Sequence, residues 1–153
     1  MSELFPEGDL TVLERRIDEW LAAFRVDNDL VADIQRGEDD ERRWYVRMRG
    51  VEKEFTTVWL TLGQRTLRYE TYFMPAPEEN AAELYEHLLR RNERMVGAHF
   101  SIGIEDAVFL RGELPNSVLE RAELDRILGS LYAYVEQCFR PALHIGFASR
   151  FRS

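Results

Sequence analysis

The chain has 153 residues, of which 45% are apolar and 31% are charged. This composition excludes a disordered protein, and the length suffices for a core that folds without metals or disulfides. The net charge of -8, from 28 acidic and 20 basic residues, argues against a nucleic-acid partner, because phosphate binding depends on concentrated Lys and Arg. We expect a single domain over residues 1–153, with a core at about 10–139 and a C-terminal tail at 140–153.

The first predicted element is an amphipathic helix. It is expected to begin near Thr11, because residues 11–14 (Thr-Val-Leu-Glu) match a capping box. Apolar residues then recur at three- and four-residue steps and form one stripe: Leu13, Ile17, Trp20, Leu21 and Phe24. Residues 27–29 should end this helix. Residues 30–34 fit either a short strand or another helical turn, and residues 37–41 are expected to form a solvated acidic loop.

Three segments of strict alternation follow and predict strands. One set of alternating positions is apolar and is expected to face the helices: Trp44, Val46, Met48, Val58, Leu60, Leu62, Leu67, Tyr69 and Phe73. Gly50–Lys53 and Gly63–Arg65 are short, polar connections that contain glycine. The three strands should therefore form an antiparallel meander.

A second helix is expected from Pro77, with Glu78 and Glu79 near the positive end of its dipole. Its predicted apolar face is made of Leu84, Leu88 and Met95, with help from Tyr85 and Leu89. After Gly97 the sequence alternates again at Phe100, Ile102 and Ile104. A turn at Glu105–Asp106 and a return strand over 107–110 complete a predicted hairpin.

The last helix is expected to start at a second capping box, residues 117–120 (Ser-Val-Leu-Glu). Its stripe contains Leu124, Ile127, Leu128, Leu131, Val135 and Cys138, while Gly129 suggests close packing. Pro141 should end or kink it. The predicted fold is α+β in the order α-β-β-β-α-β-β-α, with the meander and the hairpin packed against helices.

Four stretches of sequence carry a resemblance to a known family: residues 55–63 (FTTVWLTLG), 67–77 (LRYETYFMPAP), 84–92 (LYEHLLRRN) and 105–115 (EDAVFLRGELP). They resemble an actinobacterial member of the YbjN family, over roughly Leu10 to Phe139. That family is similar in fold to the class I type III secretion chaperones, and its members are described as sensory-transduction regulators. The resemblance implies a homodimer that holds an extended or amphipathic partner segment. It supplies no catalytic motif.

The residues themselves predict no catalytic, cofactor-binding or metal site. The three histidines, His87, His99 and His144, are scattered, and Cys138 lies among apolar residues as a core side chain. There is no nucleophile elbow or glycine-rich phosphate loop. A single cysteine, no apolar run that approaches the length of a spanning helix and no basic leader predict a cytoplasmic protein that does not enter a membrane.

One set of residues points to binding. The polar side of the predicted meander carries aromatic residues interleaved with arginines, which are the side chains that dominate protein interfaces. The residues expected to bind a protein partner are Tyr45, Arg47, Trp59, Arg68 and Tyr72. The open alternatives are an ordinary half-solvated sheet with Trp59 covered by the C-terminal tail, and a surface for a small molecule.

These observations predict a non-enzymatic, protein-binding module, chaperone-like or regulatory, and homodimeric. The alternative is a small-ligand sensor or enzyme that uses a pocket between the sheet and the helices. A ligand found in the purified protein would favour the alternative, and a co-purifying protein would favour the binding module.

Overall fold

The computed structural model describes residues 3–152, which form an α+β structure around one antiparallel sheet. The helices are α1 (Glu7–Asp27), α2 (Ala81–Asn92) and α3 (Arg121–Gly146). The strands are β1 (Val31–Arg36), β2 (Arg43–Arg49), β3 (Phe55–Leu62), β4 (Thr66–Met74), β5 (His99–Ile102) and β6 (Val108–Pro115). Three short 3-10 turns are η1 (Ile104–Asp106), η2 (Asn116–Val118) and η3 (Ala148–Phe151).

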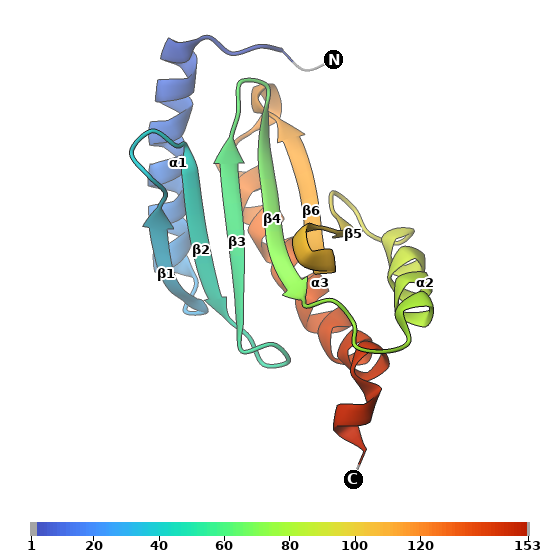
Figure 1. The fold of residues 1–153 in the computed structure, drawn as a ribbon. Coiled ribbons are helices and arrows are strands. Elements are labelled where there is room, and N and C mark those ends of the chain that lie inside the picture. Colours follow the sequence, from blue (N-terminus) through green and yellow to red (C-terminus); the bar gives the residue numbers. More distant parts are fainter. Residues whose placement is uncertain (1–2, 153) are drawn as a thin grey trace.

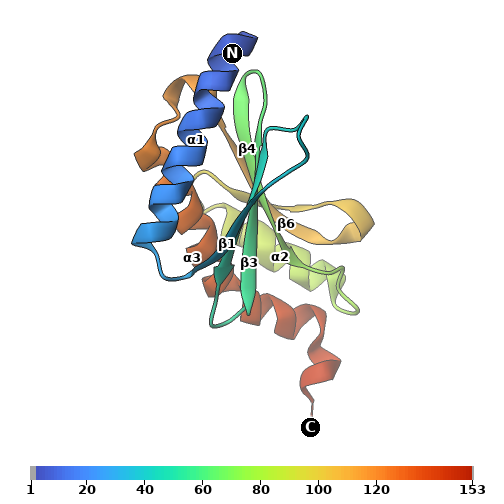
Figure 2. The same ribbon diagram turned by 90° about the vertical axis from the view of Figure 1, so that its left-hand side faces the viewer.

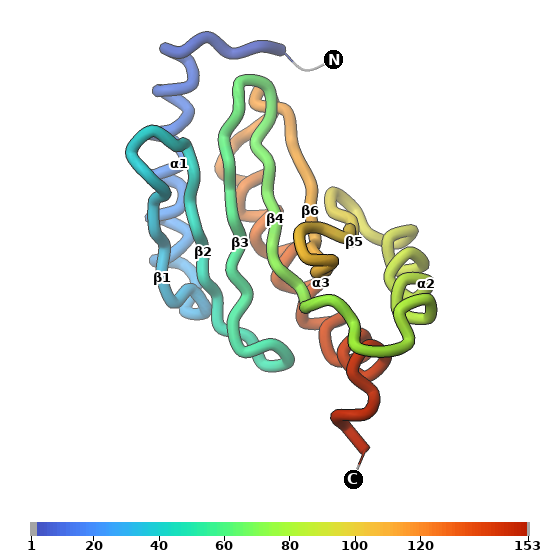
Figure 3. Tube along the Cα trace, in the orientation of Figure 1, coloured from blue at the N-terminus to red at the C-terminus, as the bar shows by residue number. Residues whose placement is uncertain are grey.

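The six strands have the spatial order β1-β2-β3-β4-β6-β5 (Figure 1). The α+β fold class is confirmed. Residues 30–34, which the sequence left open between strand and helix, lead into β1 (Val31–Arg36) at the edge of the meander. Helices α1 and α3 lie on one side of this sheet, as the turned view in Figure 2 shows. The start of α1 and the η3 turn lie at opposite ends of the molecule (Figure 3). Among residues 3–152, no helix covers the other face of the sheet.

The core lies between the sheet and the helices, where the alternation of the strands predicted it. Val46, Val58 and Leu60 are fully buried on this side, as is Leu67. They pack with the predicted stripes of α1 and α3 in one apolar cluster. Cys138 belongs to this cluster, as expected. The side chains between them must point away from the helices because successive strand residues face opposite sides.

Helix α1 begins earlier than the sequence predicted. Its first residue is Glu7, and Thr11 lies inside the helix, where its hydroxyl donates to the Glu7 carbonyl oxygen at 3.1 Å. The predicted capping box is wrong because Glu14 is used elsewhere: its carboxylate accepts from Arg36 at 2.7 Å and from Arg42 at 2.8 Å. These ion pairs link α1 to the edge of the sheet.

Helix α2 begins later than predicted. The backbone N–H groups of Glu78 and Glu79 donate to the Gly146 carbonyl at the end of α3. The residues after Pro77 are therefore bonded to α3 and do not start a helix. The helix starts after Asn80 and ends at Asn92. The predicted contribution of Leu89 to its buried face is wrong, because this side chain is 67% exposed.

Helix α3 also differs from its predicted limits. Ser117 lies in η2, and the helix starts only at Arg121, so the second capping box is wrong. The helix does not end at Pro141, because Ala142 and Gly146 beyond it are buried against the rest of the protein. This packing offsets the hydrogen bond that proline cannot make.

The prediction of close packing at Gly129 is wrong, because nothing lies within 4 Å of the position that a Cβ would take. The glycine that is required by packing is Gly112 on β6. A Cβ there would lie 2.5 Å from the Tyr69 ring. Glycine therefore allows β6 to continue as a strand to Pro115, well beyond the predicted end at Leu110.

Candidate functional site

The five residues predicted to bind a partner all lie on the open face of the sheet. Tyr45 and Arg47 come from β2, Trp59 comes from β3, and Arg68 and Tyr72 come from β4. Trp59 is 38% exposed and Tyr72 is 42% exposed, whereas their neighbours in sequence are buried. The alternation of apolar and polar residues along the strands thus correctly predicted that these five side chains share one face of the sheet. Their role in binding stays a prediction.

The structure brings Tyr45 and Trp59 together. They are direct cross-strand partners, with ring centroids 5.6 Å apart and an interplanar angle of 86°. This edge-to-face arrangement is favourable for aromatic pairs. On the same strand as Tyr45, the Arg47 guanidinium lies 3.7 Å from the centroid of the Phe55 ring. The meander therefore presents aromatic and cationic side chains that are already ordered.

Tyr72 belongs to a different group at the other side of this face. Its ring meets Phe109 of β6 edge to face at 5.7 Å, and the ammonium of Lys53 lies 5.8 Å from its centroid. Burial raises the pKa of the Tyr72 hydroxyl, with a further contribution from Glu105, so the phenol is neutral at pH 7. Burial lowers the pKa of Lys53. The five predicted residues therefore form separate groups and not one cluster.

The C-terminal segment does not cover Trp59. Arg150 in η3 pairs with Glu78 at 2.6 Å, and Ser149 donates to Glu79, which ties this segment to the connection before α2. The alternative in which the tail shields the open face is therefore wrong.

Sequence reasoning missed the part of the open face that β5 and β6 contribute. Phe109, Arg111 and Glu113 share this face, because Tyr72, Glu70 and Arg68 on β4 are their respective partners. The signal was present as alternation that continues to Leu114, but the predicted return strand ended at Leu110. His99 and Ser101 on β5 extend the face to the sheet edge, opposite Arg111 and Phe109.

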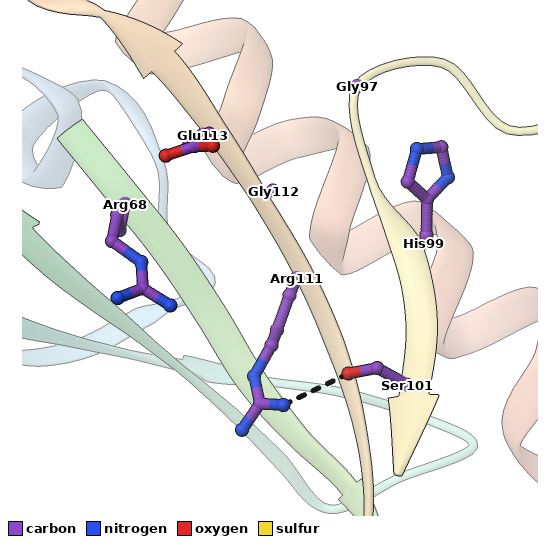
Figure 4. Close-up of a pocket in the computed structure, with 7 residues that line it drawn as sticks. All are labelled: Arg68, Gly97, His99, Ser101, Arg111, Gly112 and Glu113. Carbon is purple, nitrogen blue, oxygen red and sulfur yellow. Dashed lines mark hydrogen bonds between the residues drawn. The ribbon is translucent and has the colours of Figure 1, made fainter. Parts of the chain in front are cut away.

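These missed residues surround a hollow of about 670 Å³. It is lined by polar and small residues from β4, β6, β5 and the connection before β5, as Figure 4 shows: Arg68, Gly97, His99, Ser101, Arg111, Gly112 and Glu113. Arg111 is fixed by two bonds, one from Nε to Glu70 at 2.6 Å and one from Nη1 to the Ser101 hydroxyl at 3.0 Å. The hollow therefore holds oriented hydrogen-bond donors.

A second, apolar hollow of about 380 Å³ lies between α2 and the edge strand β5. Tyr85, Leu88 and Leu89 line it from α2, and Phe100 and Ile102 line it from β5. Ile102 is 52% exposed, so the alternation at Phe100, Ile102 and Ile104 buries only Phe100. This hollow is the kind of pocket, between helix and sheet, that the alternative prediction required.

Within residues 3–152, no three His, Cys, Asp or Glu side chains are grouped closely enough to hold a metal ion. In the same part of the chain, no helix has the length and the apolar character needed to cross a membrane.

Comparison with known proteins identifies the family. A family model described as "YbjN: Putative bacterial sensory transduction regulator" matches residues 15–143. The chain belongs to the YbjN family. The match extends from α1 almost to the end of α3, so it includes the whole sheet and its open face.

Uncharacterized proteins of mycobacteria are relatives of this YbjN protein. Those of Mycobacterium tuberculosis and Mycobacterium bovis are 31% identical to it over 104 residues, which is 68% of this chain and 57% of theirs. The relative in Mycobacterium leprae is 28% identical over 107 residues, 70% of this chain and 58% of its own. The chain thus spans little more than half the length of these relatives.

Among solved structures, the fold is similar to a chain in the heterodimeric complex ExoU-SpcU from the type III secretion system of Pseudomonas aeruginosa. The TM-score is 0.54 at 15% sequence identity, and the match covers 82% of this chain and 98% of that chain. The expected likeness in fold to secretion chaperones is confirmed. At this identity the likeness concerns the fold alone.

Proposed function

We propose that this YbjN protein is a non-enzymatic, protein-binding module with a chaperone-like or regulatory role. The observation that carries the proposal is the open sheet face, on which Tyr45, Trp59 and Tyr72 are ordered and partly exposed beside arginines. Aromatic and Arg side chains supply most of the binding energy of protein interfaces. The family description as a regulator and the secretion-complex neighbour agree with this class of function.

The bound partner is a protein segment that covers the Tyr45–Trp59 pair. The two rings offer a large apolar area whose conformational freedom is already restricted, so little ordering is needed on binding. The Arg47 guanidinium, stacked on Phe55, provides a cation at the border of the same surface. An extended segment with apolar and acidic side chains fits this combination.

Site-directed crosslinking in the native cell tests the proposal. A photoreactive amino acid at position 59 is expected to capture a defined protein, which mass spectrometry identifies. The matched control places the same amino acid at Val26, which is 82% exposed at the end of α1. Tyr45→Ala in the position 59 variant should reduce the capture. The same protein captured equally from both positions, or none from position 59, would refute the proposed surface.

A second candidate function is small-ligand sensing, because the hollow between α2 and β5 has a size within the range of ligand pockets and is mostly apolar. Indole, as a small apolar probe, should then shift the methyl signals of Leu89 and Ile102 in a saturable way. Leu89→Glu should abolish this response without loss of folding, because Leu89 is exposed. Unsaturable shifts spread over the surface would reject this candidate.

A further inference from the structure

The hollow formed by β4, β6 and β5 combines positive side chains that the fold does not neutralise fully. We propose that it is an oxyanion site, in which a carboxylate or phosphate group is held between the guanidinium groups of Arg68 and Arg111 (Figure 4). This site is distinct from the Tyr45–Trp59 pair and does not depend on a protein partner.

Arg111 is prepared for such a ligand. Its Nε donates to Glu70 at 2.6 Å, its Nη1 donates to Ser101 at 3.0 Å, and its guanidinium carbon lies 4.4 Å from the centroid of the Phe109 ring. These three contacts fix the plane of the guanidinium before any ligand arrives. The donors that remain have no acceptor among residues 3–152 and can bind an oxyanion with little loss of side-chain freedom.

Arg68 supplies the second cation. Its direct partner on β6 is Glu113, a pairing that would ordinarily neutralise both side chains. Instead, Glu113 accepts a hydrogen bond from the Thr66 hydroxyl at 3.0 Å. Arg68 makes no hydrogen bond or ion pair with any residue that the structure describes. It is therefore an exposed guanidinium at the wall of the hollow with all its donors available.

Arg68 and Arg111 lie diagonally across neighbouring strands, a spacing that long side chains can bridge through one ligand. The Ser101 hydroxyl accepts from Arg111, so its own proton is free to donate to the same ligand. Glu70 compensates part of the charge of Arg111, and Arg43, which lines the adjoining hollow beside Arg68, is itself paired with Glu41 at 3.8 Å. The cation without such a partner among the described residues is therefore Arg68. A planar carboxylate and a tetrahedral phosphate both match guanidinium donors in this arrangement.

Glu113 limits the site and makes the proposal testable. Its carboxylate lines the same hollow and competes with an anion for Arg68. Removal of that charge should therefore strengthen binding, whereas removal of Arg68 should weaken it. A hollow whose arginines serve only the fold would show neither effect.

The experiment titrates the isolated full chain with inorganic phosphate and, separately, with acetate, while chloride keeps the ionic strength constant. Amide NMR signals of Ser101 and Arg111 report binding. We expect saturable shifts with at least one anion, and the anion that produces them identifies phosphate or carboxylate as the preferred group. Arg68→Gln should weaken the apparent affinity roughly tenfold, as expected for the loss of a charge-assisted contact, and Glu113→Gln should increase it.

The matched control is Arg16→Gln, which makes the same change of charge on the exposed side of α1. It should leave the affinity unchanged. Absence of saturable shifts with both anions, or equal effects of the Arg68 and Arg16 substitutions, would overturn the proposal. Because Arg68 is exposed and unpaired within the described chain, its substitution should not unfold the protein, and the dispersion of the amide spectrum checks this.

Discussion

The side chain of Asn92 at the end of α2 is hydrogen-bonded in both directions to the backbone of Phe100 in the edge strand β5. The Phe100 N–H donates to Asn92 Oδ1 at 2.7 Å, and Asn92 Nδ2 donates to the Phe100 carbonyl at 3.3 Å. Asn92 thus occupies the place of a residue in a further strand. Since an unpaired edge is a template for association, this contact closes part of the sheet edge.

Asn92→Ala should expose this edge. Loss of both bonds leaves the Phe100 N–H without its acceptor, at an expected cost of about 1–3 kcal/mol in the free energy of unfolding. Association should also become more dependent on concentration. Asn92→Asp, which keeps the acceptor for the N–H group, should lie between Ala and the parent in urea denaturation. Equal stability of all three proteins would show that the contact has no role in closing the edge.

The protein is expected to form a homodimer, since two surfaces expose apolar side chains: the open face with Trp59 and the α2–β5 hollow with Leu89. Light scattering with size-exclusion chromatography should give twice the 18.0 kDa mass of one chain. Trp59→Ala and Leu89→Ser, tested side by side, decide which surface mediates the contact. A mass near that of one chain at every concentration would contradict the prediction.

The sequence predicted those features of the fold that follow from a pattern along one strand. It did not predict features that depend on contacts between residues far apart in the sequence. Alternation along β3 predicted the buried side of Leu60 and the open side of Trp59 correctly, because burial of one face determines the register. The two capping boxes failed because the motif is local: Glu14 of the first is engaged by Arg36 and Arg42 from the sheet, and Ser117 of the second lies in η2, ahead of the start of α3 at Arg121. Such long-range ion pairs leave no local pattern in the sequence.

The candidate site was predicted only where it lies on the meander. Alternation along the strands was enough to predict that Tyr45 and Trp59 share one face. Their edge-to-face contact, however, depends on the register between β2 and β3. The hollow at Arg111 was missed because the predicted return strand ended at Leu110, whereas β6 continues through Gly112 to Pro115. The reason for this glycine lies in other parts of the chain: the Gly97 carbonyl oxygen and the Tyr69 ring fill the space that a Cβ would need.

Cys138 should be unreactive in the folded protein. Its side chain is 1% exposed in α3, and burial raises the pKa of its thiol, so both access and thiolate formation are suppressed. We expect slow modification by a thiol reagent such as Ellman's reagent in buffer and rapid modification in urea. Cys138 is the sole cysteine of the chain, so the absorbance reports this residue alone. Rapid reaction in buffer would show that the packing of α3 around Cys138 opens readily.

The protein should lose stability as the pH falls below about 6.5, the ordinary pKa of histidine. Burial lowers the pKa of His87 in α2, Arg91 lowers it further, and Glu83 opposes them only in part. The unfolded chain therefore binds a proton at a higher pH than the folded chain does. The contribution of neutral His87 to the free energy of unfolding is fully present above the pKa that His87 has in the unfolded chain. It is lost as the pH falls from that value through the lower pKa of His87 in the folded chain.

Urea midpoints measured across this range test the His87 prediction. His87→Gln should reduce the dependence on pH, because the glutamine does not titrate. His99→Gln, at an exposed position on β5, is the matched control and should retain the dependence of the parent. Identical pH profiles for the parent and the His87 variant would assign the effect to other groups.

The neighbours Leu60 and Trp59 should respond in opposite ways to truncation. Leu60 is fully buried beneath the helices, so Leu60→Ala should remove packed atoms, leave a cavity and cost about 2–5 kcal/mol in the free energy of unfolding. Trp59 is 38% exposed on the open face, and its ring contact is with Tyr45. Trp59→Ala should therefore cost the fold less and weaken self-association or partner binding by about 2 kcal/mol.

Chemical denaturation of both variants, beside a concentration-dependent association assay, separates these effects. Tyr45→Ala serves as the control for Trp59, because it removes the other ring of the same pair while it leaves the buried face intact. The two aromatic variants should weaken association together, since each leaves its neighbour without the edge-to-face contact that orders it. If Trp59→Ala unfolded the protein while Leu60→Ala remained stable, the two faces of β3 would be exchanged and the proposed binding surface would be wrong.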